Sequence, residues 1–218
     1  MAVNKKQAWL LSDAANVEIT YDISRIVNCE LLKTWQNATG SLEPYQVAWL
    51  QDVHANLVRE WDYWNEEELK MEFVSSLFQA AKINTPQRIK TFYERTLSGR
   101  ILDTDTEPLT VICDCMVASP NKGGKPNNPY FFFQEFKKTK GDKNDPEAQM
   151  LIAMLLAQKM NNDQKPIYGA WLQGRIWNFT ILNEKEYCTG RAFDATDETQ
   201  LYQIVYILQK LKTLILER

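Results

Sequence analysis

Two apolar, strand-like segments on either side of a loop rich in Gly, Pro and Asn constrain the fold of this chain most strongly. The loop, residues 119–129, is SPNKGGKPNNP, a composition typical of a turn. The flanking segments are LTVICDCMVA at 109–118 and YFFFQEFKK at 130–138. Together they predict an antiparallel hairpin, and strands this apolar must lie in a sheet that is covered on at least one side.

The composition is that of an ordinary folded protein. Of 218 residues, 44% are hydrophobic and 24% are charged, which excludes a disordered chain. The formal net charge of -3 argues against coating of nucleic acid by the whole surface but leaves a local basic site open. No segment approaches the roughly 18 apolar residues of a membrane span, and no apolar leader follows the basic start. We therefore expect a cytoplasmic protein without membrane association.

The cysteines and the histidine disfavour two kinds of chemistry. A single C-x-C without a second pair is a weak zinc signal, and we interpret Cys113 and Cys115 as reduced core thiols. His54 is the only histidine and has no nucleophile nearby in the sequence, so Ser-His-Asp and Cys-His catalysis are disfavoured.

The periodicity of apolar residues changes near residue 88. It predicts helices at 24–36, 41–61, 65–80, 145–160 and 198–217, strands at 89–101, 109–118 and 130–138, and two or three strands within 167–189. This order predicts an α/β fold in which helices flank a mixed central sheet. Residues 1–64 would be a helical N-terminal extension packed on the core, because two short helices bury too little surface alone. Residues 65–218 would form the main domain.

The expected hairpin places two acids opposite one another. Residues i and i+2 of a strand share a face, so Glu135 and Lys137 point together and Phe136 points into the core. Asp114 points away from the two cysteines that flank it. The midpoint of 114 and 135 falls in the middle of the loop, so we expect the Asp114 and Glu135 carboxylates within about 6 Å of each other.

Facing carboxylates destabilise a sheet unless a cation lies between them. Lys137 can supply part of that charge, and Mg²⁺, which prefers oxygen ligands, would supply more. The pattern [DE]-x-K occurs at 68–70, 135–137 and 163–165, but only 135–137 lies on a predicted strand that follows another strand carrying an acid. The alternative is a solvated strand face with an ion pair between Glu135 and Lys137.

These residues resemble the PD-(D/E)XK nuclease superfamily, which has the restriction-endonuclease-like fold, over roughly residues 65–215. Asp114 matches the first acid, and Glu135 and Lys137 match the [DE]-x-K. Cys113 stands where the name of the motif has Pro. Gln149, in the first turns of the next predicted helix, matches the glutamine of the superfamily. The resemblance implies a restriction-endonuclease-like core behind the helical extension.

Residues 65–78, NEEELKMEFVSSLF, resemble the opening helix of type I restriction-subunit-like nuclease domains, and the wider chain resembles an uncharacterised bacterial group of this fold. In that helix Glu66 matches the family's acid best, with Glu68 and Glu72 as alternatives in register.

The resemblance implies a nuclease that uses Mg²⁺ or Mn²⁺ to hydrolyse DNA phosphodiester bonds. The ion would be held by Asp114, Glu135 and the Phe136 carbonyl, with Glu66 supporting it through water. A homodimer would suit the cutting of two strands. The alternative is a catalytically inactive nucleic-acid-binding or assembly protein on the same fold.

Two further side chains have roles implied by the resemblance. Lys137 would position the attacking water, and Gln149 would orient Lys137 or a phosphate.

Basic residues gather around the loop. Six lysines and two acids lie between residues 121 and 143, a local charge of 6 − 2 = +4, whereas six acids and one lysine lie between 60 and 72. We expect the basic loop beside the carboxylates, where it would hold DNA phosphates. The candidate lysines are Lys122, Lys125, Lys138 and Lys140. The alternative is an ordinary solvated loop.

Overall fold

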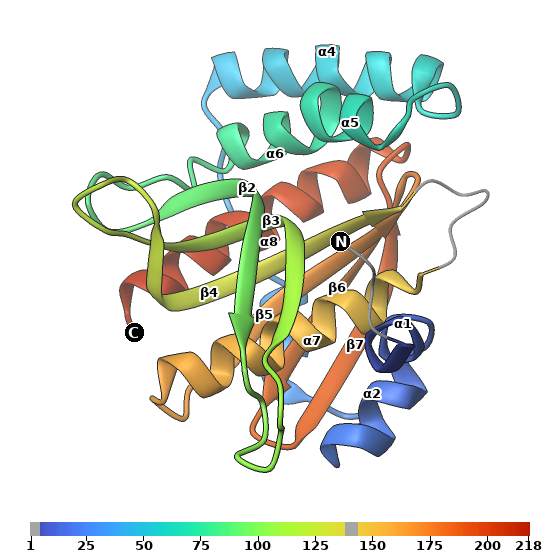
Figure 1. Ribbon diagram of the computed structural model, residues 1–218. Helices are drawn as coiled ribbons and strands as arrows, with labels where there is room; N and C mark the ends of the chain where they lie inside the picture. Colours follow the sequence, from blue (N-terminus) through green and yellow to red (C-terminus); the bar gives the residue numbers. More distant parts are fainter. Residues whose placement is uncertain (1–4, 138–143) are drawn as a thin grey trace.

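The computed structural model describes residues 5–137 and 144–218. Within them, one seven-stranded mixed sheet runs through the molecule in the order β1-β7-β6-β5-β4-β3-β2 (Figure 1). Its strands are β1 (Ser24–Arg25), β2 (Lys90–Gly99), β3 (Leu109–Pro120), β4 (Pro126–Lys137), β5 (Ile167–Gln173), β6 (Ile176–Asn183) and β7 (Glu186–Asp194). The β4–β5 and β1–β7 pairs are parallel and the other pairs are antiparallel.

Helices lie on both faces of the sheet, which confirms the expected α/β class (Figure 1). The helical segments are α1 (Lys5–Leu10), α2 (Ala14–Tyr21), α3 (Glu30–Gln36), α4 (Pro44–Glu60), α5 (Glu66–Glu68), the π-helical η1 (Leu69–Val74), α6 (Ser75–Ala80), α7 (Pro146–Asn161) and α8 (Glu198–Leu216). One core lies between the sheet and α3, α4, α6 and α8. The other lies between the sheet and α7, α1 and α2.

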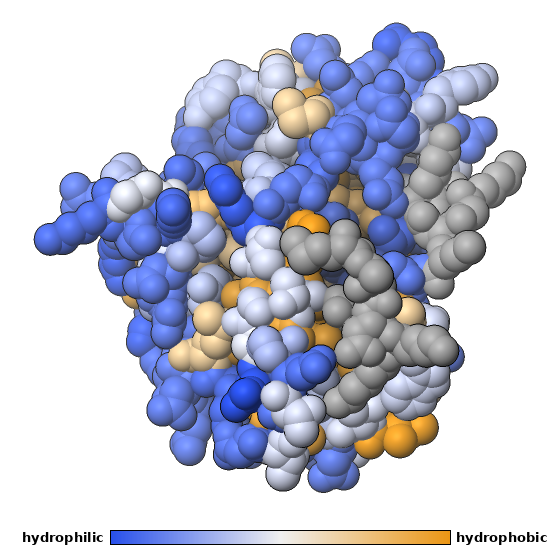
Figure 2. Space-filling model, viewed as in Figure 1, coloured by the Kyte–Doolittle hydropathy of each residue, from blue (hydrophilic) through white to orange (hydrophobic). Residues whose placement is uncertain are grey.

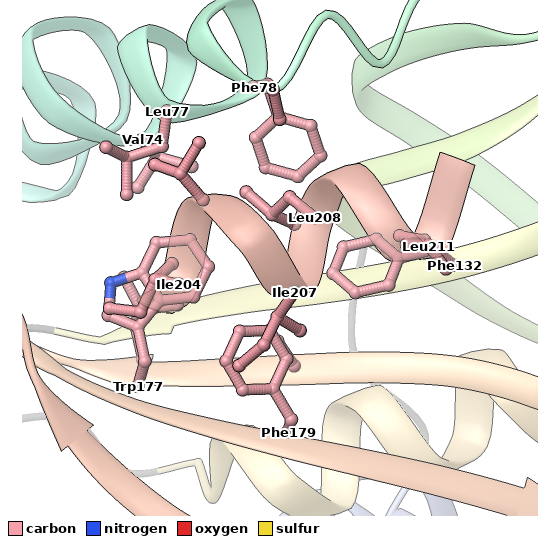
Figure 3. Close-up of a cluster of buried hydrophobic side chains, with 14 of the residues drawn as sticks. Val74, Leu77, Phe78, Phe132, Trp177, Phe179, Ile204, Ile207, Leu208 and Leu211 are labelled. Carbon is pink, nitrogen blue, oxygen red and sulfur yellow. The ribbon is translucent and has the colours of Figure 1, made fainter. Parts of the chain in front are cut away.

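The first core is built around the buried stripe of α8. Figure 3 shows this stripe between α6 and the sheet, where it contacts large aromatic side chains. The residues concerned are Ile204, Ile207, Leu208 and Leu211 of α8, Leu77 and Phe78 of α6, Val74 of η1, and Phe132, Trp177 and Phe179 of the sheet. The 3.6-residue spacing of these α8 residues places them all on one side of the helix.

Local signals set the helix starts as the sequence indicates. The Asn65 side chain accepts a hydrogen bond from the Glu68 N–H, and the Glu68 carboxylate accepts one from the Asn65 N–H, a capping box that begins α5. Asp145 caps α7 and Pro146 fills its first position, where a missing N–H does no harm.

The register of the β3–β4 hairpin is the predicted one at the end away from the turn. The pairs Cys115–Gln134, Met116–Phe133 and Val117–Phe132 have the predicted register, and the pairing ends one residue short of Asp114 and Glu135. Nearer the turn, two register shifts around Ala118 move the centre of the hairpin to the 121–125 turn. A bulge of this kind adds residues to one strand and increases its twist.

β3 bends at Asp114, and this corrects the expectation for the cysteines beside it. Cys113 belongs to the core under α7, whereas Cys115 belongs to the core on the other face. The two cysteines therefore do not point to one common side of the sheet. β2 has a matching irregularity, since Glu94 has a φ of 49° and the pairing of β2 with β3 skips Glu94 and Asp114.

The predicted helix at 24–36 is wrong in its first half. Ser24 and Arg25 form β1, because the Ser24 N–H donates to the Lys185 carbonyl and the Ile26 N–H donates to the Tyr187 carbonyl, both at 2.8 Å. Helix α3 begins only at Glu30. A two-residue edge strand has no periodicity of its own and is defined by the strand that it pairs with.

Residues 5–64 contact both faces of the sheet. The Trp35 indole N–H donates to the Ile207 carbonyl at 2.9 Å on one face, and Leu10 and Val17 lie in the core on the other. Among the described helices, none combines the length and the apolar character that crossing a lipid bilayer requires.

Candidate active site

The candidate site lies where β3 bends beside the far end of β4. The Phe136 backbone N–H donates a hydrogen bond of 2.8 Å to Asp114 Oδ2. This bond ties the Asp114 carboxyl to β4 beyond the last paired residues of the hairpin, Cys115 and Gln134, directly after Glu135 in the chain. The backbone thus brings together the two acids that the sequence predicted as neighbours.

Glu135 is buried without enough partners for a negative charge. Its exposed fraction is 1%, and its Oε2 has no hydrogen-bond partner among the described residues. Burial raises the pKa of Glu135 well above its usual range, and the Asp114 charge raises it further. Lys137 acts in the opposite direction. A carboxyl in this setting stays neutral or requires a cation.

The surroundings of Asp114 also disfavour its charged form. Burial raises the pKa of Asp114 above its ordinary value, against the lowering effect of the Phe136 N–H and of the Lys137 charge. The charge of Glu94 raises the Asp114 pKa, whereas that of Lys70 lowers it. A divalent cation between Asp114 and Glu135 would relieve both acids.

Lys137 reaches toward the opening helix of the main domain. Its Nζ lies 3.2 Å from Glu66 Oε1, and the Lys137 side chain is only 13% exposed. This distinguishes the three acids that the sequence left open. Glu66 pairs with Lys137, whereas the Glu68 carboxylate accepts the Asn65 N–H at 2.7 Å as part of the helix cap. Glu72 is exposed.

Gln149 lies in the first turns of α7, as expected. Its Oε1 is buried and has no hydrogen-bond partner among the described residues. The described contacts therefore do not include the expected interaction between Gln149 and Lys137.

Sequence reasoning missed two residues at this site, Lys70 and Glu94. Lys70 has a side chain that is 5% exposed, donates to Glu67 at 2.8 Å and forms an ion pair with Glu94 of β2. One signal was available in the sequence, because Lys70 lies on the apolar stripe that continues through Phe73, Val74 and Leu77. A lysine on a buried stripe needs acidic partners.

The turn lysines lie at the other end of the hairpin, which corrects the expectation of a basic loop beside the acids. Lys122 and Lys125 are exposed in the turn, where the surface is hydrophilic (left edge of Figure 2). Glu135 lies nine positions after Pro126 along β4, roughly 30 Å at about 3.3 Å per residue. A hairpin turn cannot lie beside residues near the open ends of its strands.

Lys138 and Lys140, the other two lysines proposed to bind nucleic acid, lie outside the described residues.

The donor set fits a hard divalent cation. Asp114 and Glu135 supply carboxylate oxygens, and one of these oxygens is buried and unpartnered. Within residues 5–137 and 144–218, no three acidic, cysteine or histidine side chains are grouped closely enough to hold a metal ion by themselves. The Phe136 carbonyl and water would have to complete the coordination.

In comparisons with known proteins, neither a family model nor a curated protein matched this chain.

Proposed function

We propose that this chain is a nuclease that uses Mg²⁺ or Mn²⁺ to hydrolyse DNA phosphodiester bonds, on a restriction-endonuclease-like core formed by residues 65–218. The observation that carries the proposal is the buried, unpartnered oxygen of Glu135 beside Asp114, with Lys137 on the same strand. Two neighbouring acids whose pKa values are both raised by burial are more typical of a functional site than of a structural ion pair.

The proposed ligands of the ion are Asp114, Glu135 and the Phe136 carbonyl. When bound, the ion would polarise the phosphoryl group and make a bound water more acidic. The Phe136 N–H holds Asp114 Oδ2, so the Asp114 carboxyl has a fixed orientation before the ion arrives. Such preorganisation lowers the reorganisation needed during the reaction.

Lys137 would place a positive charge beside the scissile phosphate. Its ammonium group is held by Glu66 at 3.2 Å, and Glu66 is itself 40% exposed. Glu66 therefore orients the lysine from the solvent side of the site and is available to water. Charge that develops on phosphate oxygens in the transition state would be stabilised by this ammonium group.

Cleavage assays on plasmid, linear duplex and single-stranded DNA test the proposal. Wild type should cut at least one of them with Mg²⁺ or Mn²⁺ and none with EDTA. Lys137→Ala should reduce the rate by about 10²–10³-fold, because it removes an interaction that strengthens in the transition state. The DNA affinity and the folded state should change little.

Lys159→Ala is the matched control, since Lys159 also pairs with one acid, Asp103, at 2.8 Å, but on an exposed surface. It should cleave as wild type does. Undiminished cleavage by Lys137→Ala would remove this lysine from the mechanism.

A non-catalytic nucleic-acid-binding or assembly protein is the second candidate, and the closed packing of Glu135, at 1% exposed, favours it. Calorimetric titration with Mg²⁺ separates the two. The nuclease should bind the ion, and Asp114→Asn should abolish that binding. Binding of DNA without any ion binding or cleavage would support the second candidate.

A further inference from the structure

The indole N–H of Trp171, on β5, is a hydrogen-bond donor inside the protein. Its nitrogen is shielded from solvent, and it has no hydrogen-bond partner among the residues that the structure describes. A buried donor that loses its hydration without gaining an acceptor is costly, so nearly all such groups have an acceptor within reach. The position of Trp171 in the sheet indicates which group that acceptor is.

Strand pairing places Trp171 directly beside Glu135. The two residues are partners in the register of the parallel β4–β5 pair. Partners in neighbouring strands point to the same face of a sheet, and neighbouring strands lie about 4.8 Å apart. The indole and the carboxyl therefore leave the sheet side by side, on the strand next to the one that carries the candidate site.

The alternation of side chains along both strands agrees with this shared face. Phe132 and Phe136 of β4 lie in the core under α8, whereas Phe133 lies in the core under α7. Glu135 comes two residues after Phe133 and so points to the α7 side of the sheet. Trp171 packs against the same α7-side core. Both side chains thus lie in the layer between the sheet and α7.

The free atoms of the two neighbours are complementary. Glu135 Oε2 is buried and, like Trp171 Nε1, has no hydrogen-bond partner among the described residues. One atom is an acceptor and the other is a donor. A hydrogen bond from an N–H to a charged carboxylate is roughly twice as strong as one between neutral groups. Rotation of the Glu135 side chain about its own bonds is the movement that would join them.

Helix α7 limits the movement of the indole in this layer. A Cβ added at Gly169, two residues before Trp171, would lie 2.7 Å from Met150 Sδ of α7, and Figure 1 shows α7 packed across β4 and β5. A ring enclosed between a helix and a sheet presents its N–H in a nearly fixed direction. Such a donor can orient a carboxylate that has more rotational freedom.

We propose that Trp171 is a positioning residue of this site, whose indole N–H donates to the Glu135 carboxylate and so determines which oxygen Glu135 offers to the ion. The inference deepens the proposed function and rests on it, because Glu135 is one of the proposed ligands of the ion. Groups that hydrogen-bond to metal ligands orient them, and loss of such a group typically lowers metal affinity by about 10–100-fold. Trp171 acts through Glu135 and does not touch the substrate.

Two-dimensional ¹H–¹⁵N NMR spectra of the tryptophan indoles test the hydrogen bond in the absence of metal. The Trp171 cross-peak is assigned through its own backbone and followed in EDTA. Glu135→Leu removes the acceptor and should move this cross-peak upfield. Gln134→Leu is the matched control, because Gln134 is equally buried and its amide is also unpartnered among the described residues, but it points to the other face of the sheet. The control should leave the Trp171 cross-peak in place.

Calorimetric titration with Mg²⁺ tests the positioning role. Trp171→Phe keeps an aromatic ring and removes the N–H, and it should bind Mg²⁺ about 10–100-fold more weakly than wild type. Trp177→Phe is the matched control. Its indole N–H is also buried and unpartnered among the described residues, but Trp177 lies in the core under α8. Trp177→Phe should bind Mg²⁺ with the affinity of wild type. The NMR measurement keeps Trp171 intact, so it tests the hydrogen bond even if Trp171→Phe does not fold.

The outcomes separate this inference from the proposed function. A Trp171 cross-peak that does not respond to Glu135→Leu, or that responds to Gln149→Leu instead, would overturn the inference. Equal Mg²⁺ affinities of wild type and Trp171→Phe would also overturn it and would leave the Asp114–Glu135 ion in place. If wild type bound no Mg²⁺, the proposed ion and the positioning role would both be overturned, whereas a cross-peak that responds to Glu135→Leu would still support the hydrogen bond.

Discussion

At the scale of single residues, the site combines two acids whose charged forms the fold disfavours. Burial is the first cause of the raised pKa for both Asp114 and Glu135. The folded protein therefore keeps protons at pH values where the unfolded chain has released them. The stability that these groups contribute is complete below their ordinary pKa values of about 4 and is lost as the pH rises through the raised values in the folded state.

Glu135→Gln should remove most of this pH dependence in metal-free protein. With EDTA present, the free energy of unfolding of wild type should fall as the pH rises from about 4. The free energy of unfolding of the variant should fall less over the same pH range. The variant therefore gains stability relative to wild type toward neutral pH. Urea unfolding at a series of pH values measures the difference.

Glu30→Gln is the control for this experiment, since Glu30 is exposed and forms an ion pair with Lys33 of the same helix. If the free energies of unfolding of Glu135→Gln and wild type differed by the same amount at every pH, the assignment of the raised pKa to Glu135 would be contradicted.

The residues that could be predicted are those that regular strand geometry brings together. The alternation of side chains along a strand, together with the position of the loop centre between the two strands, was enough to predict that Asp114, Glu135 and Lys137 lie together. Lys70 and Glu94 could not be paired from the sequence. Their contact depends on a π-helical turn and on one left-handed residue, and neither has a periodic signal.

At the scale of elements, helix α7 packs on the sheet with little space between them. A Cβ added at Gly169 of β5 would lie 2.7 Å from Met150 Sδ and 2.8 Å from Met154 Sδ. Glycine thus permits the approach of the helix that carries Gln149. Gly169 pairs with Phe133 of β4, two residues before Glu135, so this packing also supports the strand that carries the site.

Gly169→Ala should destabilise the fold by about 1–3 kcal/mol, because the added methyl overpacks a filled core and the methionines can only partly move aside. Gly99→Ala is the matched control on another strand, where the nearest atom to the new Cβ is Leu156 Cδ2 at an ordinary 3.4 Å. The stabilities of the two variants are compared by their midpoints of urea unfolding. Equal stability of both variants would show that α7 can shift away from the sheet freely.

Long elements could be predicted because their apolar periodicity repeats over several turns or residues. Helices α4, α7 and α8 and strands β2 to β4 fall within a few residues of the expected positions. β1 could not be predicted, because only the neighbouring β7 makes its two residues a strand. Such tertiary pairing overrides the helical pattern at Ser24 and Arg25, at the start of the predicted helix 24–36.

At the scale of the whole molecule, residues 5–64 pack on the same sheet as the rest of the chain. They add β1 to the sheet, Trp35 to one core and Val17 to the other. The acidic site and the basic turn are separated by the length of β4 (Figure 1). A hairpin folded back on itself keeps its turn far from its open end, and this is why charge counts along the sequence misplaced the basic residues.

This separation makes the contribution of Lys122 and Lys125 depend on DNA length. At most about 30 Å lies between the turn and Glu135, and DNA advances 3.4 Å per nucleotide along each strand. A duplex must therefore extend roughly 9 base pairs from the cleaved bond to reach the turn. The double variant Lys122→Ala/Lys125→Ala should bind a 30-base-pair duplex more weakly, and the slope of log affinity against log salt should flatten by about one unit per lost contact.

A duplex that extends only about 5 base pairs from the cut should bind and react equally well with wild type and the double variant, because it cannot reach the turn. Fluorescence anisotropy at several salt concentrations gives the affinities, and cleavage at saturating DNA gives the rates, which should not change for either duplex. An equal loss of affinity for both lengths would place the turn lysines beside the cleaved bond, contrary to the geometry of the hairpin.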